Sequence, residues 1–351
     1  MKEHRCDILV IGAGPAGSSA AWNASSLGLK VLLVDGKKFI GKPVRCAEYI
    51  PKQLFGELDI KKDFIVQPIY NMKTFMPDGE IIETPSPGYI INREKFDQVL
   101  LKRAKKAGTE VWAGCRALLK DRDYVTVRKN GEYIKIYSKI IIGADGPRSK
   151  VGKWIGSVNR NLIPAIQARV SLTSPLNDTE VYFHKDFYGG YGWLFPKDNK
   201  GNLGLGMKPE PGYPTIKESL NRLIKMLQVA GRIKGDSESF TAGWIPAESP
   251  RNITAENIIL AGDAAGQSHP LTGAGIAQAV ICGNMAGKWA ARAVRKNNIG
   301  LISEYENEWY DLYGESQKRA FRRRELLEGK WDDLDNVIKK CWVSFKEYYK
   351  D

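Results

Sequence analysis

The sequence predicts an α/β protein in which a dinucleotide-binding, Rossmann-like domain is interleaved with an antiparallel-sheet cap domain and followed by a helical C-terminal segment. Three observations predict this fold. An apolar strand runs into a glycine-rich turn over 6–17, two further apolar strands end in an acid at 140–145 and 258–263, and short strands separated by turn residues fill 160–210. The first two patterns are typical of a nucleotide-binding parallel sheet, and the third of an antiparallel sheet.

The glycine-rich turn, Gly-Ala-Gly-Pro-Ala-Gly, is the first element of a phosphate site. Gly12 permits a tight strand-to-helix turn, Gly14 lets the backbone approach a pyrophosphate, and Gly17 lets the next helix pack on the strand. The N-terminus of that helix favours negative charge. A second strand over 30–34 ends in an acid at the spacing expected of a ribose ligand. The predicted dinucleotide-binding residues are Gly12, Gly14, Ala16, Gly17 and Asp35.

The segment 258–266 repeats this logic, because an apolar strand ends in Gly-Asp before a run of small residues. A flavin needs such an element, since its ribityl chain continues past the pyrophosphate and presents hydroxyls to a carboxylate. The segment 270–276, Pro-Leu-Thr-Gly-Ala-Gly-Ile, supplies glycines that can lie against a flat ring and a helix N-terminus that favours a reduced flavin. The cofactor is therefore predicted to be FAD, bound also by Asp145, Gly262, Asp263, Gly273, Gly275 and Ile276.

These three segments together resemble the para-hydroxybenzoate hydroxylase-like flavoprotein superfamily. Within it, Gly-Lys-Pro-Val-Arg-Cys-Ala-Glu at 41–48 is similar to the Pro-Val-Arg-Cys-Gly-Glu segment of geranylgeranyl reductases, and 191–196 matches their Tyr-x-Trp-x-Phe-Pro motif. The chain differs from them at Ala47 and Tyr49, where glycine is usual. The resemblance covers residues 1 to about 300. It implies an FAD-dependent oxidoreductase that reduces carbon–carbon double bonds of a geranylgeranyl or similar isoprenoid substrate by hydride transfer.

The resemblance also implies flavin contacts from Arg45, Cys46, Ala47 and Arg93. Asp97, one helical turn after Arg93, is placed to hold that arginine in an i, i+4 pair; the alternative is a solvated surface charge. The cationic neighbours of Cys46 favour a thiolate. Its thiol is then either a proton source or redox relay, which makes it the candidate catalytic residue, or a group that packs beside the ring. We favour contact over chemistry.

Tyr191, Trp193 and Phe195 alternate along a predicted strand and share one face. They form either ordinary core or a flat hydrophobic wall over the flavin, and we interpret them as substrate-binding residues. Such a wall suits a polyprenyl chain, whose affinity comes mainly from buried carbons at about 0.8 kcal/mol per CH₂. The alternative functions are a flavin-dependent monooxygenase of an aromatic or polyketide-like substrate, and a non-enzymatic flavin protein.

The domain boundaries follow from these assignments. The FAD-binding domain is expected over 1–60, 90–160 and 240–300, the cap domain over 61–89 and 161–239, and the helical segment over 301–351. Helices are expected over 92–107 and from 216 to 227, and an Asn-Gly turn at 130–131 predicts a hairpin. The cap strands are expected at 165–172, 180–184, 191–196 and 202–208.

The composition limits the partners. Lysines and arginines number 53 against 40 acids, a net charge of +13, but no nucleic-acid-binding motif is present. The charge suits an acidic electron carrier such as reduced ferredoxin, or NADPH as a transient donor. The basic run 318–324 and the aromatic tail after it indicate either a peripheral membrane contact or a helix packed on the body. The cysteines and histidines are scattered, which predicts a cytoplasmic protein without disulfides or bound metal.

Overall fold

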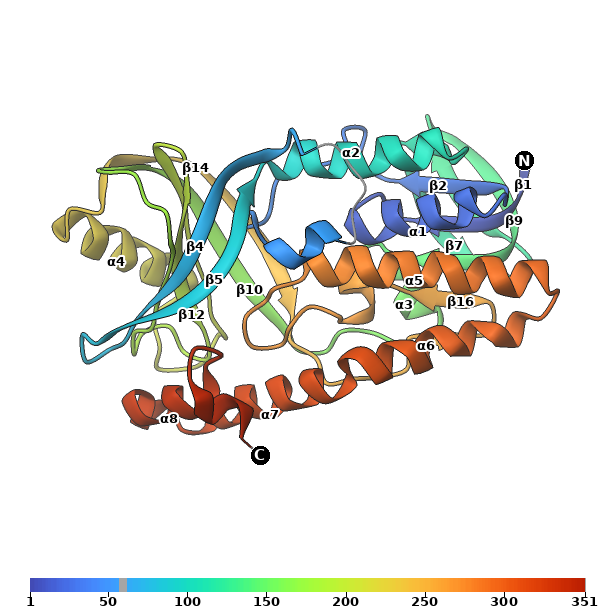
Figure 1. Cartoon of the computed structure of the whole chain (residues 1–351). Helices are drawn as coiled ribbons and strands as arrows, with labels where there is room; N and C mark the ends of the chain where they lie inside the picture. Colours follow the sequence, from blue (N-terminus) through green and yellow to red (C-terminus); the bar gives the residue numbers. More distant parts are fainter. Residues whose placement is uncertain (57–61, 351) are drawn as a thin grey trace.

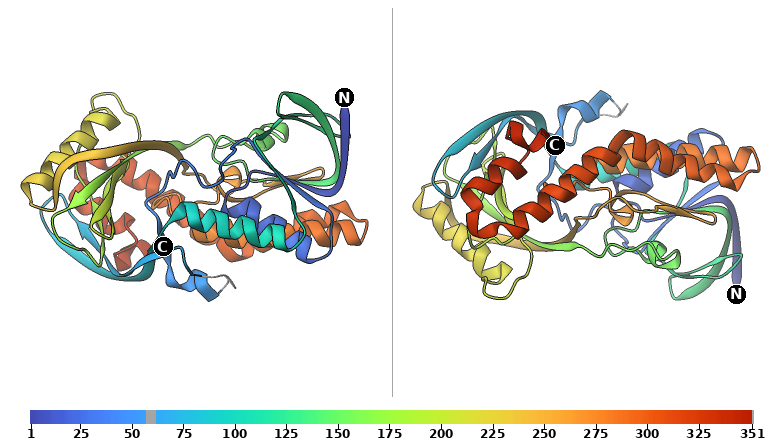
Figure 2. Two further views of the ribbon diagram at one scale, coloured as in Figure 1. Left: turned by 90° about the horizontal axis from the view of Figure 1, so that it is seen from above. Right: turned by 90° about the horizontal axis from the view of Figure 1, so that it is seen from below.

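The computed structural model describes residues 1–56 and 62–350. The molecule is elongated: one sheet lies at each end, and the C-terminal helices run along the length of both (Figures 1 and 2). Two chain segments cross between the sheets. They place residues 45–49 and 161–169 next to each other. The site described below lies at this junction.

The first sheet has the strand order β15-β16-β9-β1-β2-β6; in addition, β8 pairs antiparallel with β9, and β7 pairs antiparallel with β8. Its core pairs are parallel, and the central strands are continuous apolar runs because they are buried. Helices α1, α2 and α5 lie along the same side of this sheet in Figure 1. The bounds are β1 (Lys2–Ile11), α1 (Pro15–Ser26), β2 (Val31–Asp35), α2 (Arg93–Lys106), β6 (Glu110–Ala113), β7 (Cys115–Lys120), β8 (Val125–Lys129), β9 (Glu132–Gly143), α3 (Lys150–Trp154), β15 (Thr254–Ala255), β16 (Ile258–Leu260), η2 (Gly262–Ala265) and α5 (Ile276–Arg295).

Parallel pairing brings three strand ends together. Ile11 of β1 is paired with Gly143 of β9, and Gly143 with Leu260 of β16. The glycine-rich turn, Asp145 and Asp263 each follow one of these ends, so they lie along one edge of the sheet. Ligands of open parallel sheets bind at this edge.

The second sheet has the order β14-β10-β13-β12-β11-β4-β5-β3. All its pairs are antiparallel except that of β4 with β11. Helix α4 covers one face through Leu220, Leu223 and Leu227, and the C-terminal helices cover part of the other. The bounds are β3 (Tyr49–Pro51), η1 (Lys52–Gly56), β4 (Ile65–Phe75), β5 (Ile81–Ile91), β10 (Leu162–Leu172), β11 (Thr179–Tyr182), β12 (Tyr191–Lys197), β13 (Lys200–Gly206), α4 (Ile216–Val229) and β14 (Ile233–Pro246).

The C-terminal segment is helical, as predicted, and its aromatic residues pack on the body. Trp331, Trp342 and Tyr348 are buried, whereas Tyr349 is exposed. The packing alternative is thus confirmed for those three residues, and the membrane contact stays a prediction. No helix in the described ranges is long and apolar enough to cross a membrane. The bounds are η3 (Ile299–Ile302), α6 (Ser303–Trp309), η4 (Tyr310–Gly314), α7 (Glu315–Gly329), η5 (Trp331–Asp333), α8 (Leu334–Cys341) and η6 (Lys346–Tyr349).

The predicted helices and the hairpin are present, but two sheet boundaries differ from the predicted domain limits. β3 pairs with β5 of the second sheet, although 1–60 was assigned to the FAD-binding domain. β14 extends to Pro246 because it pairs with β10 along its length, so the second sheet ends later than residue 239. Both differences arise from pairing between strands distant in sequence, which local patterns do not encode.

Candidate active site

The glycine-rich turn has the geometry of a phosphate cradle. Gly12 has a φ of 107°, and a Cβ added there would lie 2.2 Å from the carbonyl oxygen of Ala144. A Cβ on Gly17 would lie 1.8 Å from the carbonyl oxygen of Gly12, whereas one on Gly14 would meet no heavy atom within 4 Å. Two of the glycines are therefore required by packing, and the third leaves the N-terminus of α1 open. An open helix N-terminus of this kind fits a pyrophosphate.

The acid after β2 braces this turn. Asp35 Oδ2 accepts a hydrogen bond of 2.7 Å from the amide of Ala13, and Oδ1 accepts one of 2.7 Å from the amide of Lys37. Each carboxylate oxygen retains a second lone pair for a ribose hydroxyl. The ribose contact itself stays a prediction.

Asp145, which was predicted only as a cofactor ligand, also caps the start of α3. Its carboxylate accepts hydrogen bonds from the Ser149 hydroxyl and from the amides of Lys150 and Val151, the latter two at 2.7 and 3.2 Å. These contacts satisfy the free amides at the start of α3. Its contact with the cofactor stays a prediction.

Asp263 is different, because no hydrogen bond reaches its carboxylate from any residue in the described ranges. Burial raises its pKa to about 6, and the charge of Arg93 only partly offsets that effect. The acid directly follows Gly262, which has a φ of 66°, and a Cβ on Gly275 would lie 3.5 Å from its Oδ1. A half-buried carboxylate without a donor, next to a glycine of the predicted flavin loop, fits the hydroxyls of a ribityl chain. These residues therefore fit FAD.

We expect Asp263→Asn to weaken FAD binding by about 1–3 kcal/mol, because it removes a charged acceptor from a buried hydroxyl. Wild-type protein should purify yellow with one FAD, and the variant partly or wholly colourless.

The raised pKa of Asp263 also affects the stability of the cofactor-free protein. The Asp263 carboxyl loses its proton near pH 4 in the unfolded chain and near pH 6 in the folded chain, so it lowers the free energy of unfolding as the pH rises between these values. The cofactor-free variant should thus be at least as stable as wild type at pH 7, which urea unfolding measures. Unchanged FAD affinity would show that Asp263 is not the ribityl ligand.

Arg93 and Cys46 lie together. The guanidinium of Arg93 pairs with Asp97, with distances of 3.1 Å from Nε to Oδ1 and 3.2 Å from Nη2 to Oδ2, which confirms the predicted i, i+4 pair. Burial acts to lower the pKa of Arg93, but the neighbouring Asp97 and Cys46 outweigh burial and raise it. The Cys46 sulfur also accepts a hydrogen bond of 3.2 Å from the amide of Glu48. The thiol is thus placed among donors, and the predicted flavin contacts of Arg45, Cys46, Ala47 and Arg93 stay predictions.

Glu48 anchors the Cys46 loop to the second sheet, and sequence reasoning missed it. Its side chain is 1% exposed, and both oxygens lie 2.7 Å from Lys197 Nζ. The side chains of Asn202 and Arg169 donate at 3.0 and 3.3 Å, and the amide of Arg93 at 2.9 Å. Burial alone would raise the pKa of Glu48, but these donors hold it below its ordinary value. Glu48 is the last residue of the segment 41–48, but its partners come from β10, β12, β13 and α2, so that segment alone does not show its anchoring role.

The aromatic residues of β12 share one face, as predicted. Gly192 and Leu194 face α4, whereas Tyr191, Trp193 and Phe195 face the opposite side. Trp193 is 8% exposed. The Tyr191 hydroxyl donates a 2.5 Å hydrogen bond to the carbonyl of Thr272, within the predicted flavin loop. The row of aromatic rings therefore borders that loop, and its contact with a substrate stays a prediction.

The row continues at both ends. The Tyr191 ring centroid lies 5.0 Å from that of Trp342 in the C-terminal segment, and 6.2 Å from that of Trp193. At the other end, the Phe195 ring meets the Tyr49 ring edge-on, with centroids 6.2 Å apart. The Tyr49 hydroxyl is held by Ser86 at 3.0 Å. Tyr49 thus adds its ring to the wall.

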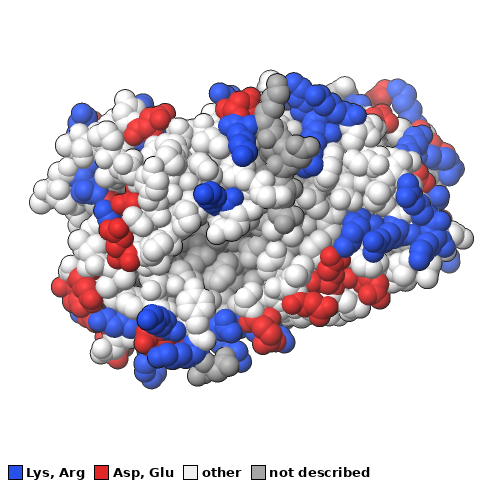
Figure 3. Space-filling view, viewed as in Figure 1, with Lys and Arg blue, Asp and Glu red and all other residues white. Residues whose placement is uncertain are grey.

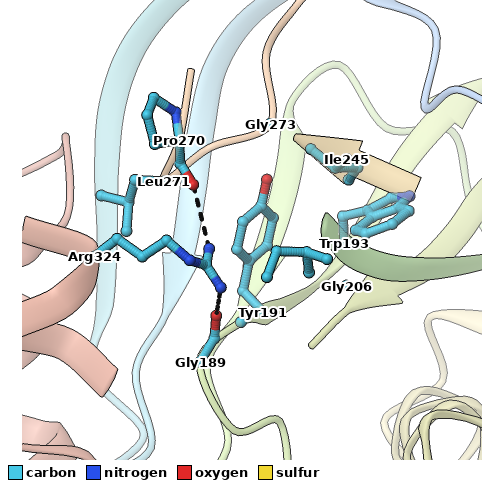
Figure 4. Close-up of a pocket in the computed structure, with 11 residues that line it drawn as sticks. Gly189, Tyr191, Trp193, Gly206, Ile245, Pro270, Leu271, Gly273 and Arg324 are labelled. Carbon is cyan, nitrogen blue, oxygen red and sulfur yellow. Dashed lines mark hydrogen bonds between the residues drawn. The ribbon is translucent and has the colours of Figure 1, made fainter. Parts of the chain in front are cut away.

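A small pocket lies between Tyr191 and Trp193, the loop 270–273 and helix α7 (Figure 4). Its lining is apolar or glycine, with one cation, Arg324. The guanidinium of Arg324 donates to the carbonyls of Pro270 and Gly189 at 3.2 and 2.7 Å, and its Nε lies 2.7 Å from Glu328. No sequence motif indicated this arginine.

Helix α7 holds the flavin loop at a second point. The side-chain amide of Gln317 is buried and donates to the carbonyls of Gly266 and Ser268, each at 3.0 Å. Further along the tail, the ring Nε2 of His269 lies 3.2 Å from the Tyr348 hydroxyl. The C-terminal segment therefore fixes the loop whose glycines are predicted to face the flavin.

Charge is distributed unevenly over the surface. The face seen in Figure 3 has a hollow near its middle with few charged side chains around it. Basic side chains gather instead over the ends of α2 and α5, whose last turns carry Arg103, Lys105, Lys106, Arg292 and Arg295. No group of His, Cys, Asp or Glu that could hold a metal occurs in the described part of the chain.

Comparisons with known proteins show which families the chain resembles. Residues 71–308 match the FAD binding domain family, and residues 7–41 match the FAD dependent oxidoreductase family. The chain is similar to a digeranylgeranylglycerophospholipid reductase of Methanothrix thermoacetophila, at 34% identity over 95% of this chain and 90% of the relative. A protein of the same description from Methanocaldococcus jannaschii is 34% identical over 98% of this chain and 97% of the relative.

The fold is also that of a solved relative. The crystal structure of a geranylgeranyl bacteriochlorophyll reductase-like protein from Thermoplasma acidophilum superposes with a TM-score of 0.88 at 29% identity, and the match covers 98% of this chain and 93% of the other. The sequence resemblance and the predicted fold class are thus confirmed. The chain belongs to the geranylgeranyl reductase family of FAD-dependent oxidoreductases.

Proposed function

We propose that this FAD-dependent reductase saturates isolated carbon–carbon double bonds of a geranylgeranyl-type lipid. The observation that carries the proposal is the aromatic face of β12, which borders both the pocket and the flavin loop. A polyprenyl chain offers only apolar surface, so its affinity must come from burial against such a face. The names of the relatives favour this function over the monooxygenase alternative.

The residues of the chain bind and orient the substrate. Reduced FAD, when bound, supplies the hydride. Tyr191 and Trp193 hold the prenyl chain against the loop 270–273, and their burial keeps water from the reacting carbons. Arg324 is committed to Glu328 and to two carbonyls, so it fixes the pocket wall and leaves the pocket interior apolar.

Cys46 lies beside the site and has two possible roles, to supply the proton that completes the reduction or to pack against the flavin. We favour packing, because the sulfur already accepts a hydrogen bond from the amide of Glu48 and lies beside the guanidinium of Arg93, so its neighbours hold it in place. Cys46→Ser keeps the size and a hydrogen-bonding group. We therefore expect near-normal FAD content and a modest loss in the rate at which substrate reoxidises dithionite-reduced enzyme. A loss of about a hundredfold or more, the scale of a missing general acid, would assign the proton to Cys46 instead.

We also propose the class of electron donor and the basic surface that would attract it. The net charge of +13 favours an anionic donor, either NADPH bound transiently or an acidic carrier such as reduced ferredoxin. Lys318 and Arg322, the exposed cations of the basic run 318–324, also suit peripheral contact with anionic lipid, which would bring the enzyme to its substrate.

Native mass spectrometry of the purified holoenzyme tests the substrate class without an electron donor. We expect an adduct beyond the mass of protein plus FAD, which organic extraction identifies as a prenyl lipid. The matched control is Trp193→Ala, which should retain FAD and lose the adduct. A co-purifying aromatic metabolite in place of a lipid would contradict the proposal.

A further inference from the structure

Gln167 of β10 links the aromatic wall to the Cys46 loop. Its Oε1 accepts a hydrogen bond of 3.2 Å from the indole Nε1 of Trp193, and its Nε2 donates one of 3.2 Å to the carbonyl of Cys46. Both the oxygen and the nitrogen of the Gln167 side-chain amide are therefore hydrogen-bonded. One end holds a residue of the second sheet, and the other holds the loop that is predicted to lie beside the flavin.

The register of the sheet explains how Trp193 reaches Gln167 across an intervening strand. Gly204 of β13 is paired with Gln167 on one side and with Trp193 on the other, so the three residues form one row. A Cβ on Gly204 would lie 2.5 Å from the indole ring. The absence of a side chain there lets the indole lie across β13 and bring its N–H to the amide oxygen.

The carboxamide of Gln167 satisfies both partners. An indole N–H can only donate and a carbonyl oxygen can only accept, so the linking side chain needs one acceptor and one donor. Glutamate would repel the Cys46 carbonyl, and methionine would satisfy neither group. The same loop is fixed on its other side by Glu48, which binds Lys197 and Asn202. Gln167 therefore joins the backbone of Cys46 directly to the indole of Trp193 through a single side chain.

We propose that Gln167 is a positioning residue that fixes the orientation of Trp193 relative to the Cys46 loop. Its importance for turnover rests on the proposed function, because the wall matters only if the substrate lies against it. The link itself does not depend on that function. A substrate that shifts the indole would also shift the backbone at Cys46.

Thiol alkylation in the holoenzyme measures the link directly. Cys46 is half-buried, whereas the other four cysteines are buried. Iodoacetamide should therefore react mainly with Cys46, and its rate of reaction reports on the position of this loop. We expect Gln167→Met to change the alkylation rate about fivefold or more, the scale of one lost hydrogen bond. The matched control is Gln67→Met, because Gln67 is also a cap-sheet amide with both ends bonded, to Leu176 and Asp198. That control should leave the rate unchanged.

A double-mutant comparison distinguishes a link from two separate effects. Trp193→Phe keeps an aromatic ring but removes the indole donor, so it should change Cys46 alkylation in the same direction as Gln167→Met. The double variant should match Gln167→Met alone. Two results would overturn the proposal. One is a double variant in which the two single-variant changes in the alkylation rate multiply, and the other is a Gln167→Met alkylation rate within about twofold of wild type.

Turnover gives the second readout. At saturating prenyl substrate, Gln167→Met should slow flavin reoxidation about tenfold with unchanged FAD content, as expected for about 1.4 kcal/mol of lost positioning. Gln167→Glu keeps the acceptor for Trp193 but loses the donor to the Cys46 carbonyl, so it should not restore the wild-type alkylation rate. If prenyl lipids prove not to be substrates, the alkylation result still decides the proposal, and the two failures remain distinguishable.

Discussion

Trp193→Ala should cost about 3 kcal/mol or more in substrate binding or turnover, the scale of truncating a packed aromatic side chain. The indole is 8% exposed, lines the pocket and is held by Gln167. Its loss opens a cavity in the wall that must hold the prenyl chain. Because none of the FAD cradle is altered, cofactor content should stay near stoichiometric. Single-turnover reoxidation of reduced enzyme at several substrate concentrations separates binding from chemistry.

Trp112→Ala is the matched control for that experiment. Trp112 lies in β6 at the far end of the first sheet, where its Nε1 donates to Glu110 at 2.8 Å. Its removal should leave reoxidation kinetics unchanged. If Trp193→Ala behaved like this control, β12 would be ordinary core and the proposed wall would be wrong.

Glu48→Gln should lower the free energy of unfolding by about 3 kcal/mol, the lower end of the range for removing one partner of a buried ion pair. Lys197 and Arg169 would be left beside a neutral amide, with side-chain exposures of 16% and 25% that moderate the loss. Because the network holds the Cys46 loop against β10, β12 and β13, cofactor affinity should fall as well. Urea unfolding of the holoenzyme and of the cofactor-free protein measures both effects.

The stabilising effect of Glu48 should depend on pH in a defined direction. The pKa of Glu48 is lower in the folded than in the unfolded chain, so its contribution is fully present above the ordinary glutamate pKa and is lost as the pH falls through the folded value. The stability difference between wild type and Glu48→Gln should therefore shrink below about pH 4. Glu238→Gln removes an exposed partner of Lys200 in the same sheet and should change stability by less than about 1 kcal/mol at any pH. A constant difference across pH would contradict the assigned role of the charge.

The parts of the site that depend on local pattern were predictable from the sequence. The glycine turn, the Arg93–Asp97 pair and the shared face of Tyr191, Trp193 and Phe195 each follow from a fixed spacing within a turn, a helix or a strand. Parallel pairing then places the strand ends together, which follows from the fold class. Direct contact of these residues with FAD or with substrate stays a prediction.

The contacts that hold the site together were not predictable. Glu48 meets Lys197, Gln167 meets Cys46, and Arg324 meets Gly189 across more than a hundred residues of chain. Each depends on strand register or helix docking, and a single sequence specifies neither. Buried polar residues of this kind read as ordinary surface positions until the elements around them are placed.

The central claim is that the aromatic face of β12 holds a prenyl chain for reduction, and anaerobic reoxidation of the reduced holoenzyme tests it most directly. Dithionite-reduced protein, freed of excess reductant, is mixed with a geranylgeranyl lipid, and flavin absorbance and product mass are followed together. The account predicts that the oxidised spectrum returns in wild type and Cys46→Ser but much more slowly in Trp193→Ala, and that the lipid gains hydrogen atoms in pairs. A flavin that stays reduced with prenyl lipids, while small aromatic compounds accelerate its reduction by NADPH, would contradict the account and favour a monooxygenase.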